Sequence, residues 1–227
     1  GSGGLCTVGG LGVMVGNLAC GLAAHGGSVA VIMPAYERRF ESWRHATPLC
    51  DLVVPLGASR VEMQVLRCVE RGVAVYLLRA PSHFVAPYHY GTSTPSSPWA
   101  RLLHAVLLPR GALLLLHWLR RRQGVNVEAI ISNDWVAALT APYARHPSWT
   151  AACGGDGGAL WGEGSWSEVP FVHVFHNLEE GYDGSVELSK ATPLAALHLL
   201  PAHLLHEEGR PAALNLSRAA LLCASQW

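Results

Sequence analysis

Apolar residues at the start of the chain follow first a helical and then an extended period. Four of them recur at steps of four, three and four residues, which predicts an amphipathic helix that buries this stripe and ends near His25. The stripe consists of Leu11, Val15, Leu18 and Leu22. Residues 28–33 then form an uninterrupted apolar run closed by Pro34, which predicts a strand buried on both faces, as in a parallel sheet.

The next segment predicts a surface loop followed by strands. Residues 36–48 are polar and aromatic without a period, and residues 50–56 return to an apolar run typical of a strand. Apolar and polar residues alternate over 61–66, Gly72 interrupts the pattern, and residues 73–78 are apolar again. Two neighbouring antiparallel strands are therefore predicted here.

A long loop and a long helix follow. Residues 81–98 contain four prolines among serine, threonine and tyrosine, which predicts a loop of unusual length. Residues 99–122 predict a helix that is kinked or split at Pro109, because proline removes a helical hydrogen bond. Its most apolar part, 102–119, is interrupted by polar residues and falls short of the roughly 20 residues of a membrane span, so a buried helix without a membrane role is expected.

The second half of the chain predicts two further apolar strands, over 127–132 and 171–175. A helix over 136–145 follows the first of them, with Asp134 in position to cap it. Residues 147–168 have little periodicity and predict an insertion loop.

Two or three short helices are predicted over 193–227, the last of them opening near Pro211. Strands that alternate with helices, several of them apolar throughout, indicate an α/β domain with a mostly parallel sheet and helices on both faces.

Composition narrows the class of protein. Half of the residues are hydrophobic, 14% are charged and the formal net charge is zero, which indicates a globular chain and no nucleic-acid partner. The six cysteines lie far apart without a C-x-x-C spacing, which favours a reducing compartment.

The first group of residues that could bind a ligand lies in the glycine-rich segment at the start of the chain. Thr7, Gly9, Gly10 and Gly12 lie in a predicted loop that runs into the first helix, where free N–H groups suit a phosphate or a sugar; the alternative is a tight strand-to-helix turn.

Asp134 and His176 follow two predicted strands, and ligands of α/β sheets bind at the carboxyl ends of strands. Each has an alternative role: Asp134 as a helix cap, and His176 as a structural hydrogen-bonding group. We expect both to line one shallow concavity with residues 9–12.

Other chemistries lack support in the sequence. The spacings of His198, His203 and His206 match no zinc signature, so no metal site is expected. No G-x-S-x-G motif occurs and no cysteine adjoins a histidine, so a hydrolase nucleophile is not indicated.

Four motifs occur in an order that resembles a known family. They are Thr-Val-Gly-Gly-Leu-Gly at 7–12, Asn-Asp-Trp at 133–135, His-Asn-Leu at 176–178, and Asn-Leu-Ser-Arg-Ala at 215–219 with Cys-Ala-Ser at 223–225. The chain resembles the N-terminal catalytic lobe of the glycogen and starch synthases of bacteria and plants and of their α-glucan synthase relatives.

This resemblance implies a GT-B fold, in which residues 1–227 form the Rossmann-like, acceptor-side lobe and a C-terminal nucleotide-binding lobe is absent from the sequence. It implies transfer of glucose from a nucleotide sugar, ADP-glucose or UDP-glucose, to an α-1,4-glucan with retention of configuration. Neither a cofactor nor a metal is implied. The expected location is the cytoplasm or the plastid stroma, and we expect the 227 residues alone to be inactive.

The resemblance also assigns roles. Thr7, Gly9, Gly10 and Gly12 would lie against the phosphates and sugar of the donor, and Asn177 would join them in binding the sugar. His176 would contact the transferred glucose and Asp134 would stand in the acceptor or sugar subsite, as the two catalytic residues.

The motifs depart from the family pattern at three positions. Thr7 replaces a lysine, Val13 an aspartate and Val136 a histidine. These departures favour a second hypothesis, a non-catalytic glucan-binding or scaffolding relative. A third is a dinucleotide-dependent oxidoreductase, against which Met33 and Pro34 stand in place of the acid that would hold a ribose.

Overall fold

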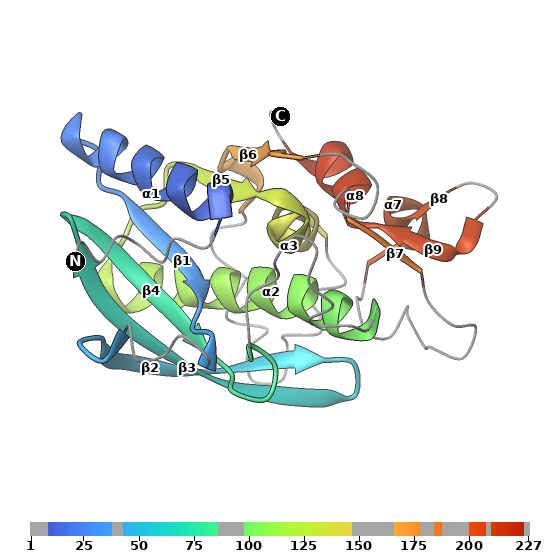
Figure 1. Cartoon of the computed structure of the whole chain (residues 1–227), viewed down its shortest axis with the longest axis horizontal. Helices are drawn as coiled ribbons and strands as arrows, with labels where there is room; N and C mark the ends of the chain where they lie inside the picture. The colour runs from blue at the N-terminus through green and yellow to red at the C-terminus, as the bar shows by residue number, and fades with distance from the viewer. Residues whose placement is uncertain are drawn as a thin grey trace. The chain divides into compact units, whose positions relative to one another are not determined.

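The computed structural model describes most of the chain (Figure 1), which divides into two compact units. The described residues are 9–37, 43–85, 98–146, 166–177, 184–187, 200–207 and 210–224. Unit 1 comprises Gly1–Leu52 and Glu62–Ser97, and unit 2 comprises Val53–Val61 and Pro98–Trp227.

A four-stranded sheet in the order β1-β4-β3-β2 follows helix α1 (Gly9–Ala24). The strands are β1 (Ala30–Pro34), β2 (Thr47–Leu56), β3 (Ser59–Glu70) and β4 (Val73–Arg79). Strands β1 and β4 are parallel, whereas β3 and β4 form the predicted antiparallel pair. Arg71 and Gly72 connect the latter, with φ of 51° and 83°, since the two-residue turns that fit the twist of a hairpin need positive φ.

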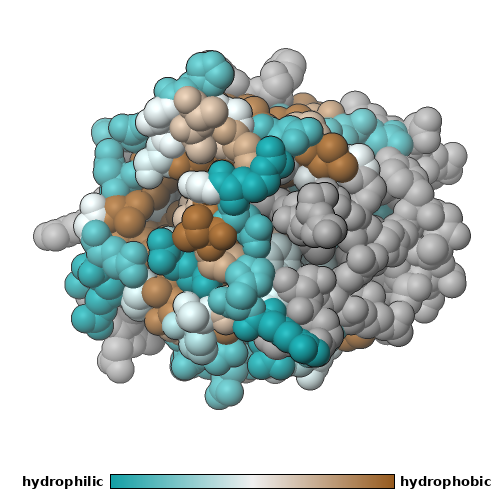
Figure 2. All heavy atoms as spheres, turned by 60° about the vertical axis from the view of Figure 1, so that its left-hand side comes forward, coloured by the Kyte–Doolittle hydropathy of each residue, from teal (hydrophilic) through white to brown (hydrophobic). Residues whose placement is uncertain are grey.

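Helix α1 buries a different face from the predicted one. Gly16 and Ala19 are buried, whereas Leu18 and Leu22 are exposed, so the predicted buried stripe is wrong. Small residues let the helix backbone lie close to its neighbours, and the larger side chains then point outward. In the view of Figure 2, apolar residues likewise reach the surface in several places between polar ones.

Two further predictions for unit 1 need correction. Strand β1 is mostly half-buried, not buried on both faces. The predicted loop 36–48 contains Trp43, which is buried in a core with Leu66 and Leu77, and β2 begins at Thr47 within that loop. The aromatic residue is therefore part of the core that holds the sheet.

The long helix of unit 2 is α2 (Pro98–Gln123). Of the two predicted alternatives at Pro109, the split is wrong because the helix is continuous there, and the kink stays a prediction. Within the described residues α2 alone is long and apolar enough to cross a membrane, and 72% of its apolar window is buried inside the protein. This burial is typical of a core helix. Arg110 is buried as well, and its burial is compensated by hydrogen bonds that it donates to the Pro55 carbonyl (2.7 Å) and the Tyr143 hydroxyl (3.1 Å).

Parallel strands β5 (Ile130–Asn133) and β6 (Phe171–Val174) confirm the two predicted apolar strands. The predicted helix 136–145 is two short helices, α3 (Asp134–Ala137) and α4 (Thr140–Arg145). The Thr140 hydroxyl donates to the Ala137 carbonyl at the break. Of the predicted insertion loop, only residues 166–168 are described, as the turn η2 (Trp166–Glu168).

The last described residues form a small antiparallel sheet and two helices. The sheet has the order β7-β9-β8, with β7 (Ser185–Glu187), β8 (His206–Glu207) and β9 (Arg210–Asn215). The helices are α7 (Ala202–Leu205) and α8 (Leu216–Cys223). The chain around Pro211 is therefore a strand, and the last helix begins only after Asn215, whose side chain accepts a hydrogen bond from the Arg218 N–H.

Candidate functional site

The carboxyl ends of β5 and β6 lie side by side, with Asn133 opposite Val174. The chain passes from β5 straight into α3, and Asp134 at this junction has a φ of 55°. Positive φ is uncommon for residues other than glycine, and aspartate is among those that tolerate it best. The sharp turn at Asp134 is thus a strained position of the kind found at functional sites.

The Asp134 carboxylate is buried and joins the two strand ends. Its Oδ1 accepts a hydrogen bond of 2.8 Å from the backbone N–H of His176. Its Oδ2 is also buried, without a hydrogen bond of ordinary geometry among the described residues. Burial raises the pKa of Asp134, although the backbone N–H groups of His176 and Asn177 oppose this shift.

The alternative role of Asp134 as a helix cap is wrong. The N-cap of α3 is Asn133, whose side chain makes no capping hydrogen bond, and the Asp134 carboxylate accepts its hydrogen bond from the segment after β6. The Asp134 carboxylate therefore ties the backbone after β6 to the end of β5.

The His176 imidazole is exposed, and its Nε2 lies 3.1 Å from Oδ1 of Asn133. Asn133 and Asp134 thus hold the ring and the backbone of His176 from the facing strand end. Asn177 is the next residue and is half-buried. The structure therefore brings Asp134 and His176 to one edge of the parallel pair, and the imidazole remains accessible.

The glycine segment differs from its prediction. Gly9, Gly10 and Gly12 form the first turns of α1 and not a loop, and positive φ among the described glycines occurs elsewhere. A Cβ atom added at Gly10 would have no neighbour within 4 Å, so there is free space beside this residue. Thr7 lies outside the described residues.

The residues 9–12 belong to unit 1, whereas Asp134 and His176 belong to unit 2. Their convergence in one concavity stays a prediction.

Sequence reasoning missed His173, which lies beneath the strand end. It is buried, and its Nδ1 lies 2.8 Å from the Ser132 hydroxyl on the facing strand. The rings of His173 and Phe175 form a T-shaped contact with 4.4 Å between their centroids. Burial lowers its pKa to about 4, and the nearby His176 adds to this shift. The alternation with buried Phe171 was the signal that could have placed His173 inward.

Gly184 was not predicted either, yet it packs against the residue next to Asp134. Its φ is 82°, and an added Cβ would lie 2.9 Å from Cβ of Trp135 and 3.0 Å from Oγ of Ser217. Its carbonyl accepts a hydrogen bond from the N–H of Leu216. Only glycine lets β7 and α8 approach α3 this closely.

Replacing Gly184 by alanine should destabilise unit 2 more than the same change at Gly124. Both positions have positive φ, but only Gly184 lacks room for a Cβ. The difference in unfolding free energy should be about 1–3 kcal/mol, the usual cost of overpacking, in urea unfolding of the chain. Equal losses at the two sites would contradict the close contact with Trp135.

His173 should make the chain sensitive to mild acid. Because its folded pKa of about 4 lies below the ordinary 6.5, its contribution is complete above pH 6.5 and is lost as the pH falls toward 4. The loss amounts to about 3 kcal/mol. His173→Asn should flatten unfolding free energy against pH in this window, and His203→Asn, at an exposed position, should not. Identical slopes for wild type and His173→Asn would refute this account.

Comparisons with known proteins give a family and a fold for this chain. Residues 2–227 match the family described as starch synthase catalytic domain. No curated protein sequence matches the chain. Among solved structures, it is similar to the catalytic domain of starch synthase IV from Arabidopsis thaliana bound to ADP and acarbose, with a TM-score of 0.68 and 18% sequence identity.

That similarity covers 97% of this chain and 41% of the plant structure. It confirms the predicted α/β fold of a GT-B catalytic domain. The described sheets are mixed and not mostly parallel as predicted, because β1–β4 and β5–β6 are parallel pairs whereas β3–β4 and the sheet β7-β9-β8 are antiparallel. The family match extends over nearly the whole chain, and the chain therefore belongs to the starch synthase catalytic domain family.

Proposed function

We propose that this chain is the acceptor-side lobe of a glucosyltransferase that moves glucose from a nucleotide sugar, in the first instance ADP-glucose, to an α-1,4-glucan with retention. The observation that carries the proposal is the Asp134–His176 pair, which sets an accessible imidazole at the carboxyl ends of two parallel strands. The similar plant domain was solved with ADP and acarbose, a nucleotide and a sugar analogue.

The chain spans 41% of that plant structure. The proposal therefore assigns the remaining donor contacts to a second lobe outside these residues, and transfer requires both lobes.

Retaining transfer needs a stabilised diphosphate leaving group and a sugar ring held with positive charge developing at its anomeric carbon. The exposed His176 ring supplies a hydrogen-bonding group beside the sugar, and Asn133 orients that ring. Asp134 acts through the His176 backbone, so it is a positioning residue. The N–H groups at the start of α1 have no partner within the helix and suit the donor phosphates.

A non-catalytic glucan-binding relative is the second candidate. Val13 is exposed on α1 where the family motif has an aspartate, and Val136 stands in α3 where it has a histidine. An exposed valine offers a sugar no hydrogen bond. Glucose transfer by the chain joined to its second lobe would exclude this candidate, and glucan binding without transfer would support it. Family membership gives no support to the oxidoreductase hypothesis.

In the two-lobed protein, Asp134→Asn should lower kcat without lowering stability. The asparagine keeps an oxygen for the His176 N–H and removes a buried charge whose pKa is raised. Because the pKa of Asp134 is raised in the folded state, ionisation of this carboxyl lowers the stability of the wild-type protein as the pH rises above 3.8. At pH 7, Asp134→Asn should therefore unfold at the same urea concentration as the wild type or at a higher one.

His176→Ala should lower kcat more steeply, by about 10²-fold or more, the usual cost of losing a positioned hydrogen-bonding group. The exposed Asp51→Asn serves as the control and should change neither kcat nor stability. Parallel losses of kcat and stability in the Asp134 and His176 variants would instead indicate purely structural roles.

Gly10→Ala tests the start of α1. Gly10 and Gly21 both lie in this helix with open space around them, so alanine at either should stabilise the chain by up to about 1 kcal/mol. Only Gly10→Ala should raise the KM for the nucleotide sugar, because its methyl group would occupy the proposed phosphate position. Equal donor KM values for the two variants would remove the α1 terminus from the donor site.

A further inference from the structure

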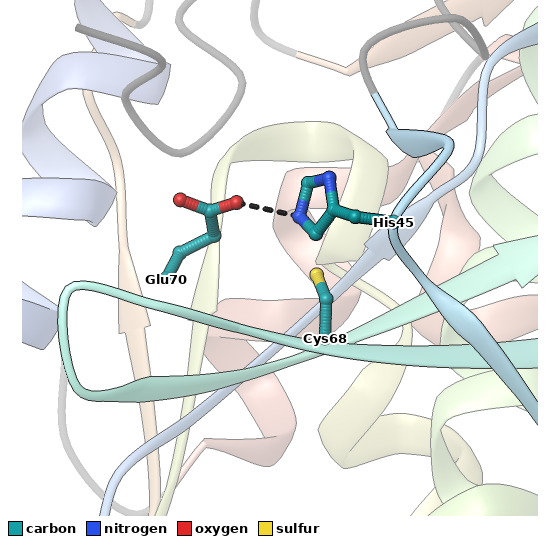
Figure 3. A group of neighbouring side chains, drawn as sticks. All are labelled: His45, Cys68 and Glu70. Atoms are coloured by element: carbon teal, nitrogen blue, oxygen red, sulfur yellow. Dashed lines mark hydrogen bonds and ion pairs between the residues drawn. The ribbon is translucent and has the colours of Figure 1, made fainter.

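A second group of chemically active side chains lies in unit 1. His45, Cys68 and Glu70 each offer one donor atom, and these three atoms all lie within 4.8 Å of one another. Figure 3 shows the thiol and the carboxylate of strand β3 converging on the imidazole of the segment that precedes β2. No short metal-binding motif in the sequence predicts this group, because His45 is 25 positions from Glu70.

Independent contacts fix the backbone beneath each donor. Cys68 and Glu70 stand two residues apart on one face of β3, opposite Val75 and Val73 of β4. The start of β2 is tied to β3 because the Thr47 hydroxyl donates to the Arg67 carbonyl at 3.3 Å. Cys68 and Glu70 are therefore presented by a paired strand, and His45 lies two residues before the strand that is tied to it.

The segment that carries His45 is anchored as well. Trp43 is buried in the same core as Cys68, and Ala46 packs against that core. The imidazole of His45 itself is about half exposed, and its Nε2 lies 2.8 Å from Oε1 of Glu70. One side of the group is thus open to solvent, where an ion can enter.

The donor set selects one kind of ion. A thiolate, an imidazole and a carboxylate together suit Zn²⁺, whereas Mg²⁺ and Ca²⁺ prefer oxygen alone. With bonds of about 2.0–2.3 Å, the ligand atoms of a tetrahedral zinc lie roughly 3–4 Å apart. The observed group needs only a modest side-chain adjustment to reach this spacing, and three protein ligands leave the fourth position for water.

We propose that His45, Cys68 and Glu70 bind one Zn²⁺ ion, with water as the fourth ligand. Binding forms a sulfur–zinc bond and releases the thiol proton to solvent. The bound ion would link the segment at His45 to the β3–β4 hairpin and stabilise unit 1 by mass action.

Co²⁺ is the probe for this site, because a thiolate bound to Co²⁺ gives a charge-transfer band in the near ultraviolet. The complete chain should show this band with one Co²⁺ per chain, and added Zn²⁺ should abolish it. Cys68→Ser should remove the band, and His45→Gln and Glu70→Gln should each weaken binding at least tenfold, a change of the order seen when a metal site loses a partner.

The controls are residues of the same kinds outside the group. They are Cys50→Ser, His25→Gln and Glu62→Gln, each of which should keep the band and the affinity. Since Cys68 is buried, circular dichroism must show that its variant is folded; if it is not, the half-exposed His45 decides the matter. No band in the wild-type chain, a band that survives in folded Cys68→Ser, or unchanged affinity in His45→Gln would overturn the proposal.

Discussion

The hydrogen bond from the His176 backbone to the Asp134 carboxylate is the constraint on which the candidate site depends. It joins the ends of two parallel strands that are 42 positions apart along the chain. The carboxylate reaches the His176 N–H from a sharp turn at which β5 passes into α3 with a positive φ, and Gly184 packs against the next residue, Trp135, where an added Cβ would lie 2.9 Å from its Cβ. An exposed imidazole is thereby presented on a buried, rigid support.

Much of this could be predicted because the relevant signals are local. Mostly apolar runs located β5 and β6, and polar residues just after these runs marked Asp134 and His176. Parallel strands end at one edge, so their proximity followed from topology. The hairpin β3–β4 was also predictable, since alternation ends at Gly72, the residue whose positive φ the turn requires.

The predictions that proved wrong concern features that depend on tertiary contacts. The apolar period of α1 is genuine, yet close packing through Gly16 and Ala19 turned Leu18 and Leu22 outward. The glycines at the start of α1 are helical, because glycine permits positive φ without requiring it.

The partners of His173 and of Cys68 depend on strand register, which sets Ser132 opposite His173 and brings His45 near β3. No spacing in the sequence encodes either group.

The central claim is that the Asp134–His176 pair belongs to a sugar site, and nuclear magnetic resonance of the chain tests it most directly. The amide resonance of His176 reports the hydrogen bond to Asp134, and the ring resonances report the exposed face. On titration with a short α-1,4-linked malto-oligosaccharide, the account predicts saturable shifts at His176 and Asn177, with none at exposed His203. Shifts confined to other residues, or none at saturating oligosaccharide, would contradict it.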